Sequence, residues 1–224
     1  MARDLSVMGN QIGAPTITRR AYNALTFGIV AIAFLITWGE YSLIMNGSLN
    51  FLLQNGLVTL LVSFVLTIVG IVLMSVGKSK QSVGVSVGGF ALFTLTFGAT
   101  TALALTHYSV GTIAYAFLIT ACLAGIFLVA GVIFPEFFSR IGGVLMIGLI
   151  GLIIIEFVAV VLFHANQTLF DYVAIALFCG FLGYDAFLMS QDAPTVPNAI
   201  FYATDIFLDI VNILIRILNI MDRD

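Results

Sequence analysis

Four polar side chains share one face of the last apolar segment of the chain. They are Asp205, Asp209 four residues later, Asn212 three residues further on, and Arg216 four residues beyond that. Residues three or four positions apart lie on the same side of an α-helix, so the four side chains form one polar stripe. A charged side chain at the centre of a bilayer costs about 2.5–3.5 kcal/mol on insertion scales. The stripe must therefore face the protein interior or a wet cavity, either as a functional site or as a hydrogen-bonded structural core.

A second set of acids lies in the preceding apolar segments. Asp185 is near the end of the sixth segment, and Glu156 is deep in the fifth. A short loop joins the sixth and seventh segments, so the two are antiparallel neighbours and Asp185 can reach Asp205 or Asp209. Depth along the helices slightly favours Asp205. Two carboxylates at close range cannot comfortably both ionise, so the pair would share a proton. Calcium, which prefers carboxylate oxygens, could transiently displace that proton.

Three further roles stay open from the residues alone. Asp185 is close enough to a helix end to be simply solvated. Glu156 is either an additional functional acid or a structural residue. Arg216 can pair with Glu156, pair with Glu40, or extend outward to the interface. We expect Glu40 itself, near the end of the first segment, to be interfacial.

The composition explains which elements carry these side chains. Of 224 residues, 61% are hydrophobic and only 8% are charged, against about 25% charged in a soluble domain. A membrane helix needs about 20 mostly apolar residues, and we identify seven such runs after a polar segment at residues 1–20. They are 21–45, 51–76, 84–106, 112–134, 141–163, 168–189 and 198–220. The predicted fold is an all-α integral membrane protein with one seven-helix domain at residues 21–224.

Basic residues predict the orientation of these helices. Arg3, Arg19 and Arg20 precede the first span, Lys78 and Lys80 follow the second, and Arg140 follows the fourth, whereas the first, third and fifth breaks contain no Lys or Arg. Such residues accumulate in cytoplasmic loops. We expect a multi-pass protein of a bacterial cell membrane, with the N-terminus in the cytoplasm and the C-terminus on the opposite side.

Several segments resemble the Bax inhibitor-1 family, also called the transmembrane Bax inhibitor motif family. The matching segments are 206–214 (IFLDIVNIL), 183–186 (GYDA), 140–143 (RIGG) with 148–154 (GLIGLII), and, more loosely, 93–98 (FTLTFG). The resemblance covers most of the chain from about residue 20. It implies a compact seven-helix bundle around a central last helix, and a pH-dependent calcium leak gated by Asp185 and Asp209. Asp205 and Glu156 depart from the family pattern.

We therefore expect a pH-sensitive calcium leak channel, with Asp185 and Asp209 as the gating pair and transient calcium ligands. Lipid, protons and calcium are the expected partners. One alternative is a membrane protein that regulates another membrane protein, such as a protease, through residues 1–20. A second is a proton-coupled transporter that uses Glu156 and the acids of the seventh segment, Asp205 and Asp209, as a proton relay. No hydrolase, metalloprotease or phosphate-loop motif occurs, so we expect neither an enzyme nor a bound cofactor. The net charge of −3 gives no reason to expect a nucleic-acid partner.

Overall fold

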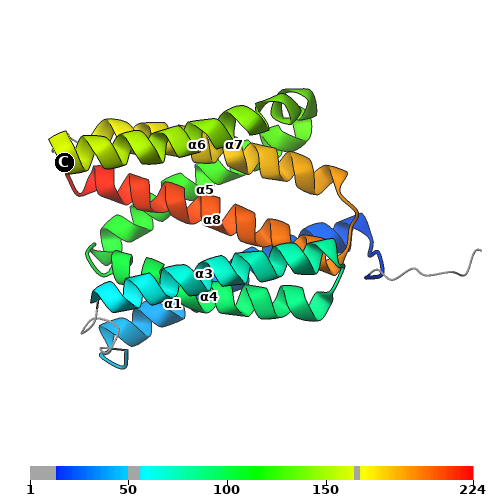
Figure 1. The fold of residues 1–224 in the computed structure, drawn as a ribbon, viewed down its shortest axis with the longest axis horizontal. Coiled ribbons are helices and arrows are strands. Elements are labelled where there is room, and N and C mark those ends of the chain that lie inside the picture. The colour runs from blue at the N-terminus through cyan, green and yellow to red at the C-terminus, as the bar shows by residue number, and fades with distance from the viewer. Residues whose placement is uncertain (1–13, 50–55, 164–166, 224) are drawn as a thin grey trace, which may run out of the picture.

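The computed structural model describes residues 14–49, 56–163 and 167–223, which form seven α-helices and no strand (Figure 1). The helices are α1 (Arg19–Met45), α3 (Gly56–Ser79), α4 (Val83–Leu105), α5 (Val110–Ile133), α6 (Pro135–Phe163), α7 (Thr168–Gln191) and α8 (Val196–Met221). Within these described residues, α1, α3, α4, α5, α6 and α7 are long and apolar enough to cross a membrane. The protein is therefore an all-helical, multi-pass membrane protein, and α8 is its one described helix outside that set of six.

The predicted spans agree with the helices to within a few residues except at two starts. Residues 50–55, where the second span was expected to begin, lie outside the described residues. The fifth span was expected to begin at residue 141, but α6 begins at Pro135, directly after Phe134. Proline is favoured in the first turn of a helix, where its missing N–H has no partner to lose. Arg140 consequently lies within α6 and not in a loop.

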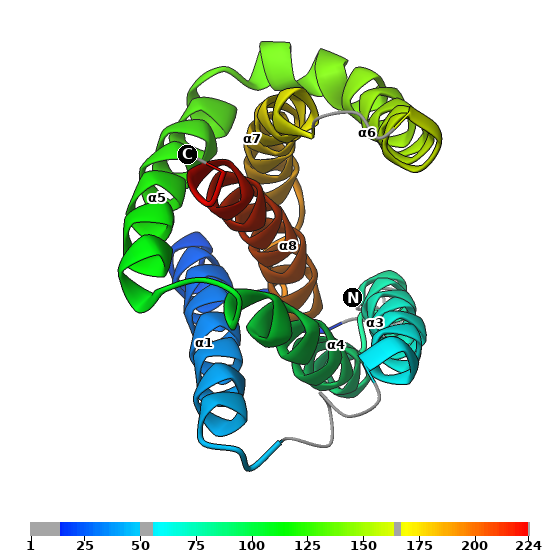
Figure 2. The same cartoon turned by 90° about the vertical axis from the view of Figure 1, so that its left-hand side faces the viewer.

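The central position belongs to α8. It packs against α1, α3, α4, α5 and α7, and Figure 2 shows α8 enclosed by these helices in the end-on view. Most of its apolar side chains are buried, and Phe207 makes edge-to-face contacts with Phe34 of α1 and with Phe93 and Phe97 of α4. By contrast, α3, α5 and α6 expose long rows of large apolar side chains, such as Leu57 and Ile147. The core therefore surrounds α8, and the outer helices present apolar faces suited to lipid.

Close backbone contacts fix some of the outer helices. A Cβ at Gly89 of α4 would lie 2.8 Å from the carbonyl oxygen of Gly70 in α3. A Cβ at Gly131 of α5 would overlap the carbonyl oxygen of Gly183 in α7. Small residues allow membrane helices to approach this closely. The α3–α4 and α5–α7 contacts thus depend on the absence of side chains at these positions.

The helix α6 packs against α7 and, more weakly, α5, and it lies at the edge of the bundle in Figure 2.

At the end of the bundle where α1 and α8 begin, residues before α1 meet the α7–α8 connection. The Ile17 N–H donates to the carbonyl oxygen of Pro194 at 2.8 Å, and Thr16 forms an isolated antiparallel bridge with Thr195. We call this end the N-terminal end of the bundle.

Candidate functional site

Two buried carboxyl groups meet between α7 and α8. Asp185 lies three-quarters of the way along α7, and Asp209 lies near the middle of α8. Their carboxyl groups are within hydrogen-bonding reach of each other. Among the described residues, no N–H or hydroxyl donor reaches the buried Oδ2 atom of Asp209. A carboxylate only accepts hydrogen bonds, so contact between the two groups requires a proton on one of them.

Asp205 lies one helical turn before Asp209 and is only partly buried. It is close enough to both Asp185 and Asp209 for their charges to interact. Depth along the helices slightly favoured Asp205 as the partner of Asp185, but the hydrogen-bonding contact is with Asp209 and Asp205 acts at longer range. Within the described chain, no group of three or more His, Cys, Asp and Glu side chains could hold a metal ion. A cation at the pair would therefore have two protein carboxylates as its acidic ligands.

A polar network closes the N-terminal end of the bundle beside these acids. The Lys78 ammonium donates to the Tyr202 hydroxyl and also pairs with Asp192 Oδ2, each at 2.8 Å. The Tyr202 hydroxyl donates to the same Asp192 oxygen at 2.6 Å. Burial alone would raise the pKa of the Asp192 carboxyl, but these two hydrogen bonds and the lysine charge outweigh it and hold the pKa below its ordinary value. Lys78 also interacts electrostatically with Asp185 and Asp205.

A second charged network lies at the opposite end of the bundle. Arg216 donates to both carboxylate oxygens of Glu156, at 2.6 and 2.9 Å, and to Asp171 Oδ1 at 2.9 Å. Arg223 pairs with Asp171 Oδ2 at 2.9 Å. These four residues, which we call the ion-pair network, join α6, α7 and the C-terminal part of α8. Two positive and two negative charges make the network neutral.

The residues of the predicted polar stripe of α8 therefore belong to two different sites. Asp205 and Asp209 belong with Asp185, whereas Arg216 belongs to the ion-pair network. Between them, the Asn212 side chain donates to the carbonyl oxygen of Leu208 in its own helix, at 2.8 Å. Of the two partners considered for Arg216, Glu156 is the one that it contacts.

Asp171, which the sequence did not single out, is fully buried at the start of α7. Its position in the first turn of a helix resembles that of an ordinary exposed acid. The useful signal was the excess of positive charge in Arg216 and Arg223, which needs more acid than Glu156 alone supplies.

The expectation for Glu40 was wrong, because this residue is buried between α1 and α4. Its Oε2 atom lies against Gly98, where a Cβ would overlap it, and the hydroxyl of Thr37 also lies close to Gly98. No donor reaches Oε2 in the described residues. The missing side chain at Gly98 opens the space that Glu40 fills.

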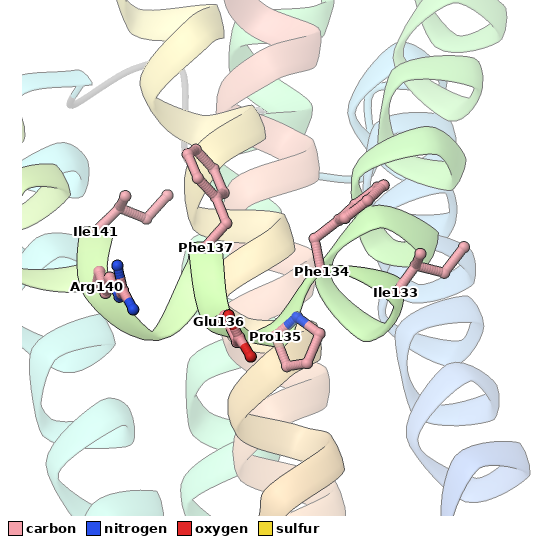
Figure 3. Close-up of a pocket in the computed structure, with 7 residues that line it drawn as sticks. All are labelled: Ile133, Phe134, Pro135, Glu136, Phe137, Arg140 and Ile141. Atoms are coloured by element: carbon pink, nitrogen blue, oxygen red, sulfur yellow. The ribbon is translucent and has the colours of Figure 1, made fainter.

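A cavity of about 790 Å³ lies at the α5–α6 turn (Figure 3). Its lining includes the apolar side chains of Phe134 and Phe137, and its charged members are Glu136 and Arg140. Both charged side chains are exposed. The cavity does not include the acidic pair and adds no group to that site.

Comparison with known families places nearly the whole chain in one family. The family model described as "Inhibitor of apoptosis-promoting Bax1" matches residues 14–224, which is nearly the whole chain. The chain belongs to the Bax inhibitor family. No curated protein and no solved structure matches it significantly. The resemblance inferred from the seventh apolar segment is thus confirmed. The matched range includes the acidic pair, the polar network around Lys78 and the ion-pair network.

Proposed function

We propose that this Bax inhibitor family protein is a pH-sensitive calcium leak channel in which Asp185 and Asp209 form the gate. The observation that supports this proposal most directly is the buried contact between the two carboxyl groups, which needs a shared proton. Loss of that proton leaves two negative charges at close range in a low-dielectric environment. The contact between α7 and α8 then becomes repulsive unless the carboxyl groups separate or a cation lies between them.

Calcium is the permeant ion that this chemistry favours, because it is a hard cation that prefers carboxylate oxygens. With two protein carboxylates and no closed cage of ligands, binding would be transient, as conduction requires. In this proposal all seven helices cross the membrane, and α8 crosses as the lipid-shielded central helix. Arg19, Lys78 and Arg140, all at the N-terminal end of the bundle, favour a cytoplasmic location for that end.

Calcium flux in reconstituted vesicles tests this proposal. Purified protein is placed in vesicles that contain a calcium indicator, and initial rates are measured across about pH 6 to 8. We expect protein-dependent flux that varies with pH, and loss of that variation in both Asp185→Asn and Asp209→Asn. Asp222→Asn, which changes an exposed aspartate at the end of α8, is the matched control and should keep the wild-type profile.

Two results would contradict the proposal separately. Absence of calcium flux at every pH would exclude the channel. Flux with an unchanged pH profile in both asparagine variants would exclude the pair as the gate.

The other two functions receive less support from the described residues. A proton relay through Glu156 is not favoured, because Arg216 engages both oxygens of this carboxylate. A regulatory role mediated by residues 1–20 depends largely on residues 1–13, which lie outside the described residues. Co-purification of a stoichiometric partner that is lost on deletion of this segment would favour the regulatory role.

A further inference from the structure

A deep apolar groove runs along the membrane-facing surface between α1 and α5. Its volume is about 700 Å³, within the range of about 300–1,000 Å³ typical of ligand pockets. Phe34 and Ala31 of α1 line one wall, and Ala114 of α5 lines the other. Leu105 of α4 and Leu214 of α8 also line it, so the groove reaches from the surface to the central helix. Figure 2 shows α1 and α5 beside each other, with α8 next to both.

The lining offers almost nothing to a polar ligand. None of the described residues that line the groove is charged. Its two threonine hydroxyls already donate to carbonyl oxygens of their own helices, from Thr37 to Ala33 at 3.0 Å and from Thr101 to Phe97 at 2.8 Å. Cavities lined by apolar groups exclude water. The chemistry of the groove therefore suits a hydrocarbon chain.

The position of the groove identifies the source of that chain. Three of the helices that line it are α1, α4 and α5, which are each long and apolar enough to cross a membrane. At one end, Trp38 lines the groove, is 49% exposed, and stacks on Tyr41 with ring centroids 5.2 Å apart. An exposed tryptophan is typical of the headgroup level of a bilayer, whereas Tyr41 is itself buried. The groove thus extends from that level into the hydrocarbon region.

We propose that this groove is a specific binding site for one acyl chain of a membrane phospholipid, with the glycerol end of the lipid beside Trp38 and Tyr41. The chain would contact α8 directly at Leu214 and, through one ring, at Phe207. Phe34 provides that link, because it lines the groove and packs edge-to-face on Phe207 at 4.8 Å between centroids. The bound lipid is then a structural ligand of the helix that carries Asp205 and Asp209. This site does not depend on the proposed channel function.

Trp38 is the only tryptophan in the sequence, so its fluorescence reports on the groove. Protein in detergent micelles is titrated with a phospholipid whose acyl chains carry bromine, which quenches tryptophan on contact. We expect quenching that saturates at about one phospholipid per protein, as binding at a single site requires. Quenching that rises in proportion to lipid without saturating would overturn the proposal, because it would indicate general lipid contact.

Filling the groove provides the matched comparison. Ala114→Phe adds a ring from the α5 wall, and Ala31→Phe adds one from the α1 wall; both alanines are exposed, so neither ring enters the core. Ala121→Phe makes the same change two turns further along α5, at an exposed alanine that does not line the groove. We expect lipid binding about tenfold weaker in the first two variants and unchanged in the third. Equal affinity in all three variants would also overturn the proposal.

Discussion

Replacing Glu156 with leucine tests whether the ion-pair network holds α6 to the rest of the bundle. The substitution leaves Arg216 and Arg223 sharing the single carboxylate of Asp171, so the network gains a net positive charge. Removing one partner of a buried ion pair costs about 3–5 kcal/mol. The side chains of Arg216 and Glu156 keep 23% and 18% of their exposure, so we expect a smaller loss of about 2–3 kcal/mol.

The corresponding double variant makes this prediction sharper. Arg216→Leu alone leaves Glu156 unpaired and should also cost about 2–3 kcal/mol. Glu156→Leu combined with Arg216→Leu leaves the neutral pair of Asp171 and Arg223. We therefore expect the double variant to lose about as much stability as either single variant, which corresponds to a coupling energy of about 2 kcal/mol.

Thermal unfolding in detergent, followed by circular dichroism, measures these differences. A loss of about 2 kcal/mol corresponds to a fall in Tm of about 4–8 °C for a chain of this size. Glu136→Leu removes an exposed glutamate from the first turn of the same helix and should leave Tm almost unchanged. Additive losses in the double variant would refute the reasoning, because they would show that Glu156 and Arg216 stabilise the protein independently.

Two further changes test contacts elsewhere in the bundle. Hydrogen bonds from Lys78 and Tyr202 hold the pKa of Asp192 below its unfolded value of about 3.9. The Asp192 carboxylate therefore stabilises the folded state above about pH 3.9. This stabilisation disappears as the pH falls through the lower folded-state pKa. Lowering the pH from about 5 to 3 should therefore reduce the Tm of the wild type more than that of Asp192→Asn. The corresponding difference in the free energy of unfolding should be less than about 1 kcal/mol, because the side chain is 39% exposed. An identical decline of Tm in both proteins would contradict this assignment. Gly131→Ala should destabilise the protein by about 1–3 kcal/mol, because the added Cβ would overlap the backbone of Gly183. Gly125→Ala on the same helix adds a Cβ in open space and should not destabilise the protein. Equal Tm values for the two variants would show that α5 and α7 can separate without cost.

Much of the fold was accessible from the sequence because a bilayer imposes one simple requirement. Backbone groups in hydrocarbon must be paired within the segment, so long apolar runs are helices. The start of α6 at Pro135 was missed because Glu136 and Arg140 look like loop residues, although a helix end at the interface accepts charge. The central position of α8 followed from the family resemblance and from its polar stripe, since a helix with Asp205, Asp209 and Arg216 cannot face lipid.

The contacts of the site were harder to predict from the sequence, because pairing between side chains depends on the axial register of neighbouring helices. A shift of one turn exchanges Asp205 for Asp209 as the neighbour of Asp185, and helix starts inferred from sequence are uncertain by about that amount. Glu40 shows the same limitation, since its burial depends on Gly98 of a different helix. Spacing along one chain segment predicts which side chains share a face, but not which face of the neighbouring helix they meet.

The ion-pair network also constrains the order in which the protein can be made. Glu156 is synthesised 60 residues before Arg216 and enters the membrane while its partner is still within the ribosome or has not been made. An unpaired glutamate in hydrocarbon raises the free energy of insertion, so we expect α6 to be stable in the bilayer only after α8 emerges. We therefore expect α6, α7 and α8 to assemble in one late step, in which Arg216 pairs with Glu156 and Asp171.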